Sequence, residues 1–159
     1  MKNSKNSLSA SEALDKIKNW CAYQERCQEE VRQKLFTLGI IALDADQIIS
    51  TLIEEGFLNE ERFARSYVRG KFKIKNWGRL KIKSGLKIKK IPIDLINLAM
   101  QEIEEETYYE TMKKVLELKL KKTKEKNPVK RNFQLINYAY GKGFEHDLIT
   151  EVLKDLKEI

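Results

Sequence analysis

Apolar residues in this chain recur mostly at three- and four-residue intervals, and only two prolines, Pro92 and Pro128, interrupt its 159 residues. That spacing places apolar side chains on one face of an α-helix. A sequence with so few helix-breaking residues predicts an all-α protein. The predicted helices cover residues 9–23, 27–38, 44–55, 59–74, 78–89, 92–105, 107–124, 128–141 and 145–157.

Several of these helices have capping residues at their predicted starts. In a capping pair a side-chain oxygen accepts from the backbone N–H three residues later, and the side chain at that later position accepts in return. Pro92 and Pro128 suit the first position of a helix, where the missing N–H removes no hydrogen bond. Three capping pairs are predicted: Ser9 with Glu12, Asp44 with Gln47, and Thr107 with Glu110.

The middle helices and the residues that end them form a threefold repeat. In each copy two core residues four apart lead to a residue suited to a left-handed turn, and an apolar residue follows. The first copy is predicted to have a turn three residues longer than the others, from Ile41 to Asp46. Lys90 replaces glycine in the middle copy, which costs about 1 kcal/mol if its φ is positive. The matched residues are Val31, Leu35, Gly39 and Ile40; Ile82, Leu86, Lys90 and Ile91; and Leu135, Ala139, Gly143 and Phe144, followed by the third-helix pairs Ile48 and Leu52, Leu95 and Ala99, and Ile149 and Leu153.

The repeat predicts a flexible tail at residues 1–8 and three units of three helices at residues 9–57, 58–105 and 106–159. Three short helices close only a small core, so each unit is expected to stack on its neighbour. The predicted architecture is an elongated array of helix-turn-helix-like repeats. Such an array offers surface for binding more readily than a closed catalytic cleft.

Basic residues are concentrated in two stretches of the chain. The net charge is +7, and between residues 61 and 90 twelve basic residues accompany a single acid, Glu61. A second basic stretch covers residues 113–131, and acidic stretches lie between and beyond the two. This distribution favours a polyanionic partner on one face. The sequence has no apolar run long enough for a signal peptide or a membrane span, which predicts a cytoplasmic protein with no membrane partner.

Arg62, Arg65 and Arg69 recur at three and four residues and therefore lie along one stripe of the predicted helix 59–74. Either they form an exposed row that binds phosphates or carboxylates, or they pair with Glu61 and with acids of other helices. The first basic stretch supplies the candidate binding residues Arg62, Arg65, Arg69, Lys71, Lys73, Lys75, Arg79, Lys81 and Lys83. The second supplies a secondary patch of Lys113, Lys114, Lys121, Lys122, Lys130 and Arg131, for which solvated helix surface is the alternative.

The segment from Lys71 to Lys83 has a second interpretation. Its residues also alternate with a period of two around Asn76-Trp77-Gly78, as in a basic β-ribbon. The repeat and the helical flanks favour helix, and the ribbon remains open. Phe72 is predicted to pack in the core, whereas Trp77 either packs or stacks on the bases of single-stranded DNA.

Few residues are expected to converge on a catalytic or metal site. His146, the only histidine, is placed at the start of the last helix, where capping or exposure is expected. Cys21 and Cys27 lack the spacing of a zinc site and are predicted to be reduced packing residues. The glycines do not form a phosphate-binding loop. The sequence therefore predicts no enzymatic activity, no metal and no cofactor.

The segment Gly56-Phe57-Leu58-Asn59-Glu60-Glu61-Arg62-Phe63-Ala64 resembles the RecX family of bacterial recombination regulators. The resemblance continues in Gln24 to Gly39, in Gly78 to Ile91, and in Lys142-Gly143-Phe144 with the residues after it, so that it extends from about residue 10 onward. Two positions differ from the family pattern: Gly85 stands where the family usually has Glu, and Lys90 where it has Gly.

The resemblance implies an all-α array of tandem three-helix units that binds the RecA–DNA filament. It also implies that such a protein inhibits RecA ATPase, filament extension and strand exchange, and thereby modulates recombination, DNA repair and the SOS response. The expected partners are the RecA filament and, weakly and without sequence specificity, single-stranded and double-stranded DNA, bound by a monomer. The alternative is a free-standing DNA-binding protein that uses its units as helix-turn-helix modules.

Overall fold

The computed structural model describes residues 8–157, and in that range the chain forms nine α-helices, one short 3-10 helix and no strand. Residues 1–7 of the predicted tail lie outside the described residues. The segment 71–83 is helix, loop and helix, so the helical prediction is confirmed and the ribbon is wrong. The elements are α1 (Ala10–Tyr23), α2 (Gln28–Thr37), α3 (Ala42–Glu54), α4 (Glu60–Lys73), α5 (Arg79–Ile88), α6 (Ile93–Ala99), η1 (Met100–Glu102), α7 (Glu105–Lys122), α8 (Pro128–Gly141) and α9 (His146–Lys157).

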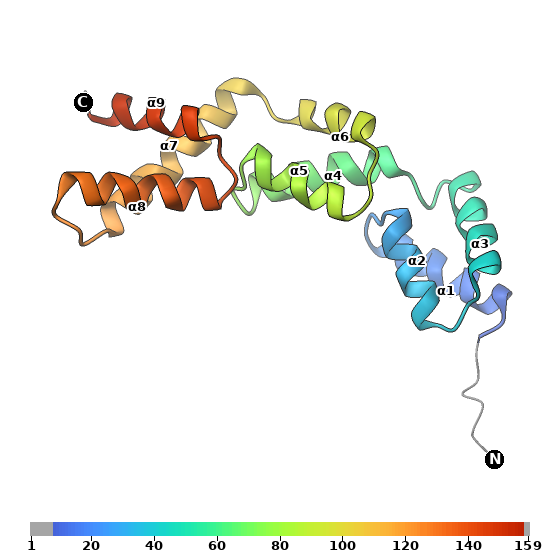
Figure 1. The fold of residues 1–159 in the computed structure, drawn as a ribbon. Helices are drawn as coiled ribbons and strands as arrows, with labels where there is room; N and C mark the ends of the chain where they lie inside the picture. Colours follow the sequence, from blue (N-terminus) through green and yellow to red (C-terminus); the bar gives the residue numbers. More distant parts are fainter. Residues whose placement is uncertain (1–7, 158–159) are drawn as a thin grey trace, which may run out of the picture.

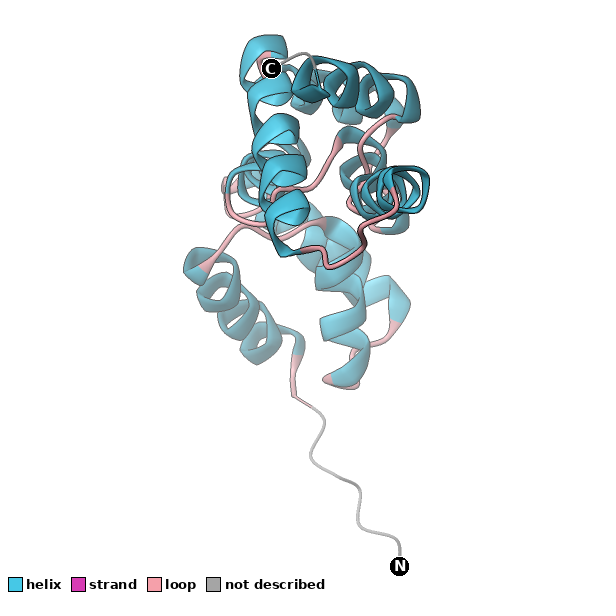
Figure 2. Cartoon of the chain, turned by 90° about the vertical axis from the view of Figure 1, so that its left-hand side faces the viewer, coloured by secondary structure: helices cyan, strands magenta, loops and turns pink. Residues whose placement is uncertain are grey.

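The helices form an elongated array, as the repeat predicts. Figure 1 shows α1 to α3 at one end, α4 to α6 in the middle and α7 to α9 at the other end, with the row bent downward at the first three helices. Figure 2 looks along the array from the α7 to α9 end, and the first three helices lie behind and below. The proposed unit boundaries at residues 57/58 and 105/106 stay a prediction.

Not every helix starts where its capping signal suggested. Ser9 does cap α1, because its Oγ accepts from the N–H of Glu12 at 3.2 Å and donates to the Glu12 carboxylate at 3.0 Å. The pairs at Asp44 and Thr107 are wrong, since α3 begins at Ala42 and α7 at Glu105, which places both side chains inside the first turn. A capping pattern is short enough to occur by chance within a helix.

Two other helix starts depend on asparagine. The side chain of Asn59 accepts from the N–H of Arg62 at 2.9 Å, and that of Asn127 accepts from Val129 at 3.0 Å, with Pro128 in the first turn as predicted. These bonds satisfy backbone donors that have no partner within the helix. Pro92 lies one residue before α6 instead of in its first position.

The threefold repeat is a repeated C-terminal cap. Gly39, Lys90 and Gly143 have φ values of 79°, 59° and 99°, so each adopts the left-handed conformation that was predicted. In each copy the next residue folds back and donates its N–H to the carbonyl five residues earlier. These bonds are Ile40 to Leu35 at 3.0 Å, Ile91 to Leu86 at 3.1 Å and Phe144 to Ala139 at 3.2 Å.

The predicted longer turn in the first copy is wrong. The connections Leu38–Ile41, Lys89–Pro92 and Lys142–Glu145 all contain four residues. The equivalent core residues of the third helices are therefore Ala45, Ile96 and Ile149, each five residues after the folded-back apolar residue and each buried. Alignment of the three repeat copies favoured Ile48 over the smaller Ala45, because α3 has four buried positions. In the middle copy it selected Leu95, whereas Ile96 is the buried residue.

The buried residues form two separate cores. One core contains the inward faces of α1, α2 and α3, together with Leu58. The other combines the inward faces of α4 to α9 and also includes Cys27. The middle and last groups of helices therefore share one apolar interior, whereas the first group has its own.

Backbone hydrogen bonds and aromatic rings join α4 and α5 to the last three helices. Gly78 donates its N–H to the carbonyl of Lys142 at 2.7 Å, and Leu80 donates to Gly143 at 2.9 Å. Three aromatic rings pack in a row across the same helices, with centroids 5.9 Å apart for Phe72 and Tyr108 and 5.4 Å apart for Tyr108 and Phe144. Phe72 is thus a core residue, as predicted.

Both cysteines are buried and free, which confirms that they are packing residues. Burial raises the pKa of the Cys27 thiol to about 12 and also raises that of Cys21. Because the thiolate is the nucleophile, we expect neither residue to react with iodoacetamide at about pH 8 in the folded protein. Mass spectrometry should show no alkylation until urea unfolds the chain, and rapid labelling of the folded protein would contradict this burial.

Candidate functional site

The arginine stripe of α4 is engaged in ion pairs. Arg65 contacts Glu102 of η1 at 3.1 Å and Glu61 at 3.3 Å, and Arg69 contacts Glu102 at 3.2 Å. The hydrogen bond from Arg65 lowers the pKa of the Glu102 carboxyl. Of the two alternatives left open by the sequence, pairing with Glu61 and with an acid of another helix is therefore the one observed. These arginines connect α4 to η1.

Arg62 connects the first two groups of helices. Its Nε lies 2.6 Å from the Glu25 carboxylate, in the connection between α1 and α2. Its Nη2 donates to the carbonyl of Gly56 at 3.0 Å. Gly56 has a φ of 78°, and the chain turns there from α3 towards α4. Arg62 thus holds the junction between the two groups.

Arg79 is the most enclosed of the four candidate arginines in the first basic stretch, with 19% of its side chain exposed. Its guanidinium lies 2.6 Å from Glu105 and 3.0 Å from Glu145, and 4.0 Å from the ring centre of Tyr108. The Tyr108 hydroxyl accepts from the N–H of Arg79 and donates to Glu145. Burial, with this bond to Glu145, raises the pKa of Tyr108. The contacts fasten α5 to α7 and to the connection before α9.

The five candidate lysines of the first basic stretch differ from its arginines in their contacts. Within residues 8–157 none of them forms an ion pair with an acid. The ammonium groups of Lys71 and Lys81 lie 4.8 and 4.4 Å from the ring centre of Trp77. Trp77 is half-buried against the larger core, so it packs, and lysines also cover its ring. Stacking of a DNA base on Trp77 would require these lysines to move. The five are Lys71, Lys73, Lys75, Lys81 and Lys83.

The secondary patch lies on α7, α8 and the connection between them. In this patch Lys114, Lys121, Lys122 and Lys130 are exposed, whereas Lys113 and Arg131 are half-buried. None of the six forms an ion pair with an acid among the described residues.

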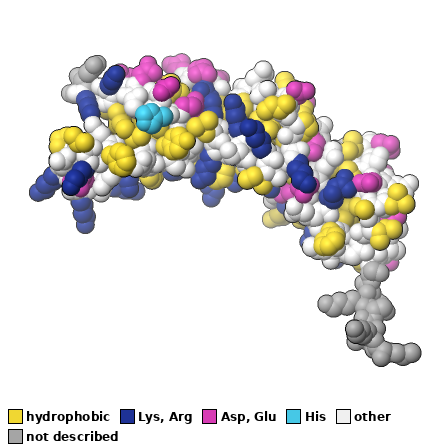
Figure 3. All heavy atoms as spheres, in the orientation of Figure 1, with side chains coloured by type: hydrophobic (Ala, Val, Ile, Leu, Met, Phe, Trp, Pro, Cys, Tyr) yellow, Lys and Arg dark blue, Asp and Glu magenta, His cyan; other side chains and the backbone are white. Residues whose placement is uncertain are grey.

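Both basic stretches contribute to one edge of the molecule. Figure 3 shows Lys and Arg side chains projecting from the lower edge at the α4–α5 connection and at the α7–α8 connection. Asp and Glu side chains gather on the opposite edge, near α9 and the start of α7. Because the array bends at α1 to α3, the lower edge is concave (Figure 1). We call it the concave basic edge.

The residues that sequence reasoning did not identify are the distant acids that pair with the arginines. Glu25 and Glu102 each lie 37 residues from their arginine, and Glu145 lies 66 residues from Arg79. No local pattern marks such pairs, because they form only when distant helices meet. The nearby acid Glu61 was the one partner that could be named from helical spacing.

His146 is exposed at the first position of α9, where the sequence placed it. Across the described residues no three His, Cys, Asp or Glu side chains are arranged to hold a metal ion. Across the same residues no helix is both long and apolar enough to span a bilayer.

Comparison with protein families identifies two of the helical groups. Residues 59–100 match the model of the second three-helix domain of RecX, and residues 105–153 match that of the third. The chain is 30% identical over 152 residues to the regulatory protein RecX of Clostridium acetobutylicum, a match that covers 92% of this chain and 67% of that protein. It is 25% identical over 153 residues to RecX of Thermotoga maritima, covering 96% of this chain and 89% of that protein.

Other relatives are longer. The match to RecX of Bacillus mycoides, at 24% identity, covers 88% of this chain and 52% of that protein. The match to RecX of Clostridium perfringens covers 62% of its length. The chain thus spans between about half and two thirds of these curated relatives.

Solved structures agree with the fold. The crystal structure of RecX from Lactobacillus salivarius superposes with a TM-score of 0.84 at 25% identity, covering 94% of this chain and 97% of that one. A second RecX crystal structure gives a TM-score of 0.83 at 19% identity, covering 91% and 71%, and supports the fold alone. With two matching domain models over more than half of its length, the chain belongs to the RecX family.

Proposed function

We propose that the protein binds the RecA–DNA filament in the cytoplasm and inhibits RecA ATPase, filament extension and strand exchange. By this action it modulates recombination, DNA repair and the SOS response. It acts as a monomer and by binding alone, without catalysis or a cofactor. Its contacts with single-stranded and double-stranded DNA are weak and independent of sequence.

The concave basic edge is the observation that most supports this proposal. The DNA of a nucleoprotein filament carries negative phosphates, and a concave row of ammonium groups complements that charge and the convex shape of a filament. The lysines are better suited to this role than the arginines of the first stretch, because Arg62, Arg65, Arg69 and Arg79 already hold acids of the same chain. The binding surface is therefore assigned to Lys71, Lys73, Lys75, Lys81 and Lys83, together with the exposed lysines of the secondary patch.

Reversing the charge of three of these lysines tests the assignment. Lys73→Glu, Lys75→Glu and Lys81→Glu together should raise the concentration for half-inhibition of RecA ATPase on single-stranded DNA by at least about tenfold. All three residues are exposed, so helicity measured by circular dichroism should not change. Inhibition by the unaltered protein should weaken as salt is added.

The control variant carries Lys16→Glu, Lys154→Glu and Lys157→Glu. These lysines are exposed on α1 and α9, outside both basic stretches, and the net charge falls from +7 to +1 in either triple variant. The control should inhibit as the unaltered protein does. Full inhibition by the first variant would refute the assignment, and equal loss in both would mean that only net charge matters. Tight duplex binding without RecA would instead support a free-standing DNA-binding protein.

A further inference from the structure

Helix α8 has a second apolar stripe that the rest of the described chain leaves mostly exposed. Its core face is formed by Leu135 and Ala139. Val129, Phe133, half-buried Ile136 and Tyr140 follow one another at intervals of four, three and four residues, so they share another face of the helix. Val129 is 78% exposed, Phe133 66% and Tyr140 57%. Single exposed apolar residues are normal, but a stripe of this kind marks a binding surface.

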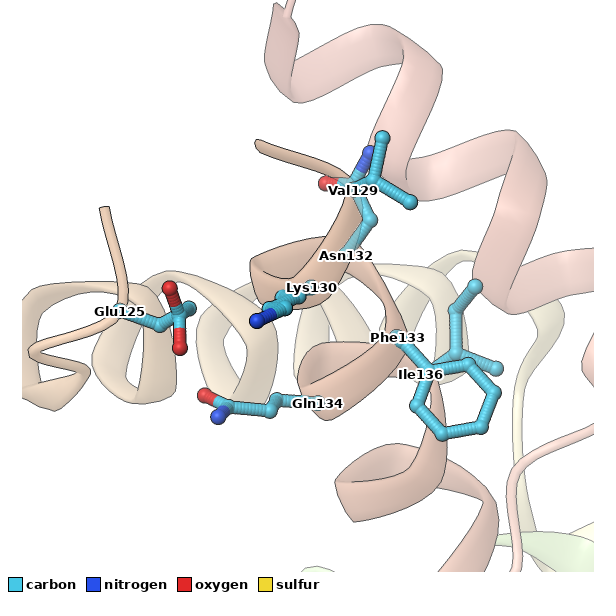
Figure 4. Close-up of a pocket in the computed structure, with 7 residues that line it drawn as sticks. All are labelled: Glu125, Val129, Lys130, Asn132, Phe133, Gln134 and Ile136. Carbon is cyan, nitrogen blue, oxygen red and sulfur yellow. The ribbon is translucent and has the colours of Figure 1, made fainter. Parts of the chain in front are cut away.

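The stripe borders a hollow of about 480 Å³. Figure 4 shows Val129, Phe133 and Ile136 together on one side of α8, while Lys130 and Gln134 extend from its other side, towards Glu125. The lining therefore combines an apolar face of α8 with an adjacent polar face. Such a shape accepts the ridge of one amphipathic helix, in the way that helix-binding grooves accept their targets.

The charge around the hollow selects the kind of partner. From Lys119 to Arg131 the chain carries seven basic residues and one acid, Glu125. None of the seven basic side chains is in an ion pair within residues 8–157. A second copy of this chain paired symmetrically through the stripe would bring the same positive charge against it, which is unfavourable. A bilayer is broad and flat, whereas the stripe is one helix wide and lies beside a hollow.

We propose that the α8 stripe is a docking site for an acidic amphipathic helix of a protein partner. Apolar side chains of the partner fill the hollow against Val129 and Phe133, and its carboxylates face Lys126 and Lys130. This site shares Lys130 with the secondary patch and uses none of the other lysines assigned above, and it does not depend on the proposed function.

A designed peptide tests the site without RecA or DNA in the assay. The probe is a fluorescent helical peptide of about 15 residues, with leucines at i, i+4, i+7 and i+11 and flanking glutamates. Fluorescence anisotropy should show binding by the unaltered protein. Val129→Ser with Phe133→Ser should weaken binding at least about tenfold, and Lys126→Glu with Lys130→Glu should also weaken it.

Controls separate docking from simple charge attraction. Phe36→Ser changes an aromatic residue that is 82% exposed on α2, far along the array, and should bind as the unaltered protein does. Circular dichroism should show the same helicity for all variants, since every altered side chain is exposed. Equal binding of a scrambled peptide, or unchanged binding by the Val129→Ser, Phe133→Ser variant, would overturn the proposal. No binding up to about 1 mM peptide, or binding of anionic vesicles in its place, would also overturn it.

Discussion

Replacing Gly78 by alanine is expected to lower the free energy of unfolding of helices α4 to α9 by about 3 kcal/mol. A Cβ atom at Gly78 would lie 2.3 Å from the carbonyl carbon of Gly143 and 2.3 Å from the nitrogen of Phe144. Both are backbone atoms, so no side chain can move aside. The added methyl group would force apart two connections that are held together by the hydrogen bond from Gly78 to Lys142.

Gly143→Ala should be at least as damaging. Gly143 has a φ of 99°, and its added Cβ would lie 2.4 Å from the Cβ of Lys81 and 2.6 Å from the Lys81 nitrogen. The variant therefore combines backbone strain with a steric clash.

Urea unfolding monitored through Trp77 measures both effects. Trp77 packs against the larger core, and Trp20→Phe removes the other tryptophan. Gly70→Ala and Gly141→Ala are matched controls, because both glycines are helical and a Cβ there would meet no atom within 4 Å. They should raise stability by about 0.5 to 1 kcal/mol. If Gly78→Ala unfolded at the same urea concentration as the unaltered protein, the close contact at this joint would be wrong.

The parts of this fold that follow from sequence are local ones. Helix positions, the left-handed turns at Gly39, Lys90 and Gly143, and the burial of Phe72 depend on spacing within a few residues. At Lys90, alignment of the three repeat copies placed a lysine at the turn position where the other copies have glycine, and its φ is indeed positive at 59°. Errors arose where two local signals competed, as at Ala45 and Ile48.

The candidate site was less predictable, because contacts between distant segments determine which of its basic residues pair with acids. Arg65 and Lys73 are both basic residues of α4, yet Arg65 faces Glu102 and Lys73 is exposed without an acid partner in the described range. Helical spacing gives the face of a residue but does not reveal which helix will cover that face. The separation of structural arginines from available lysines therefore required the assembled array.

The two joints of the array differ in their chemistry. The joint between α4–α6 and α7–α9 has a continuous apolar core, to which the ion pairs of Arg79 and the backbone hydrogen bonds of Gly78 and Leu80 are added. The joint between the first three helices and α4–α6 is mainly polar: Arg62 pairs with Glu25 at 2.6 Å, and Lys89 and Lys90 pair with Glu30 and Glu29 at 3.4 and 3.5 Å. Partly exposed pairs of this kind contribute about 0 to 1 kcal/mol each. Among the described residues that precede α4, Cys27 is the one buried residue that belongs to the larger core.

Leu35→Ala is accordingly expected to unfold helices α1 to α3 while leaving α4 to α9 folded. Leu35 is fully buried in the smaller core, and removing its side chain costs about 2 to 5 kcal/mol. A core built from about 50 residues has a free energy of unfolding that is little larger than this loss. The polar joint adds little stabilisation from helices α4 to α9. Trp20 packs against this core, so in a Trp77→Phe background its fluorescence should report an unfolded environment without urea.

In a Trp20→Phe background, Trp77 should keep its transition to within about 0.5 kcal/mol. Phe36→Ala, at the adjacent and 82% exposed position, is the control and should shift neither transition by more than about 0.5 kcal/mol. If Leu35→Ala shifted the transitions of both tryptophans equally, the two cores would unfold as one cooperative unit. The polar joint would then have to couple them far more strongly than its exposed ion pairs allow.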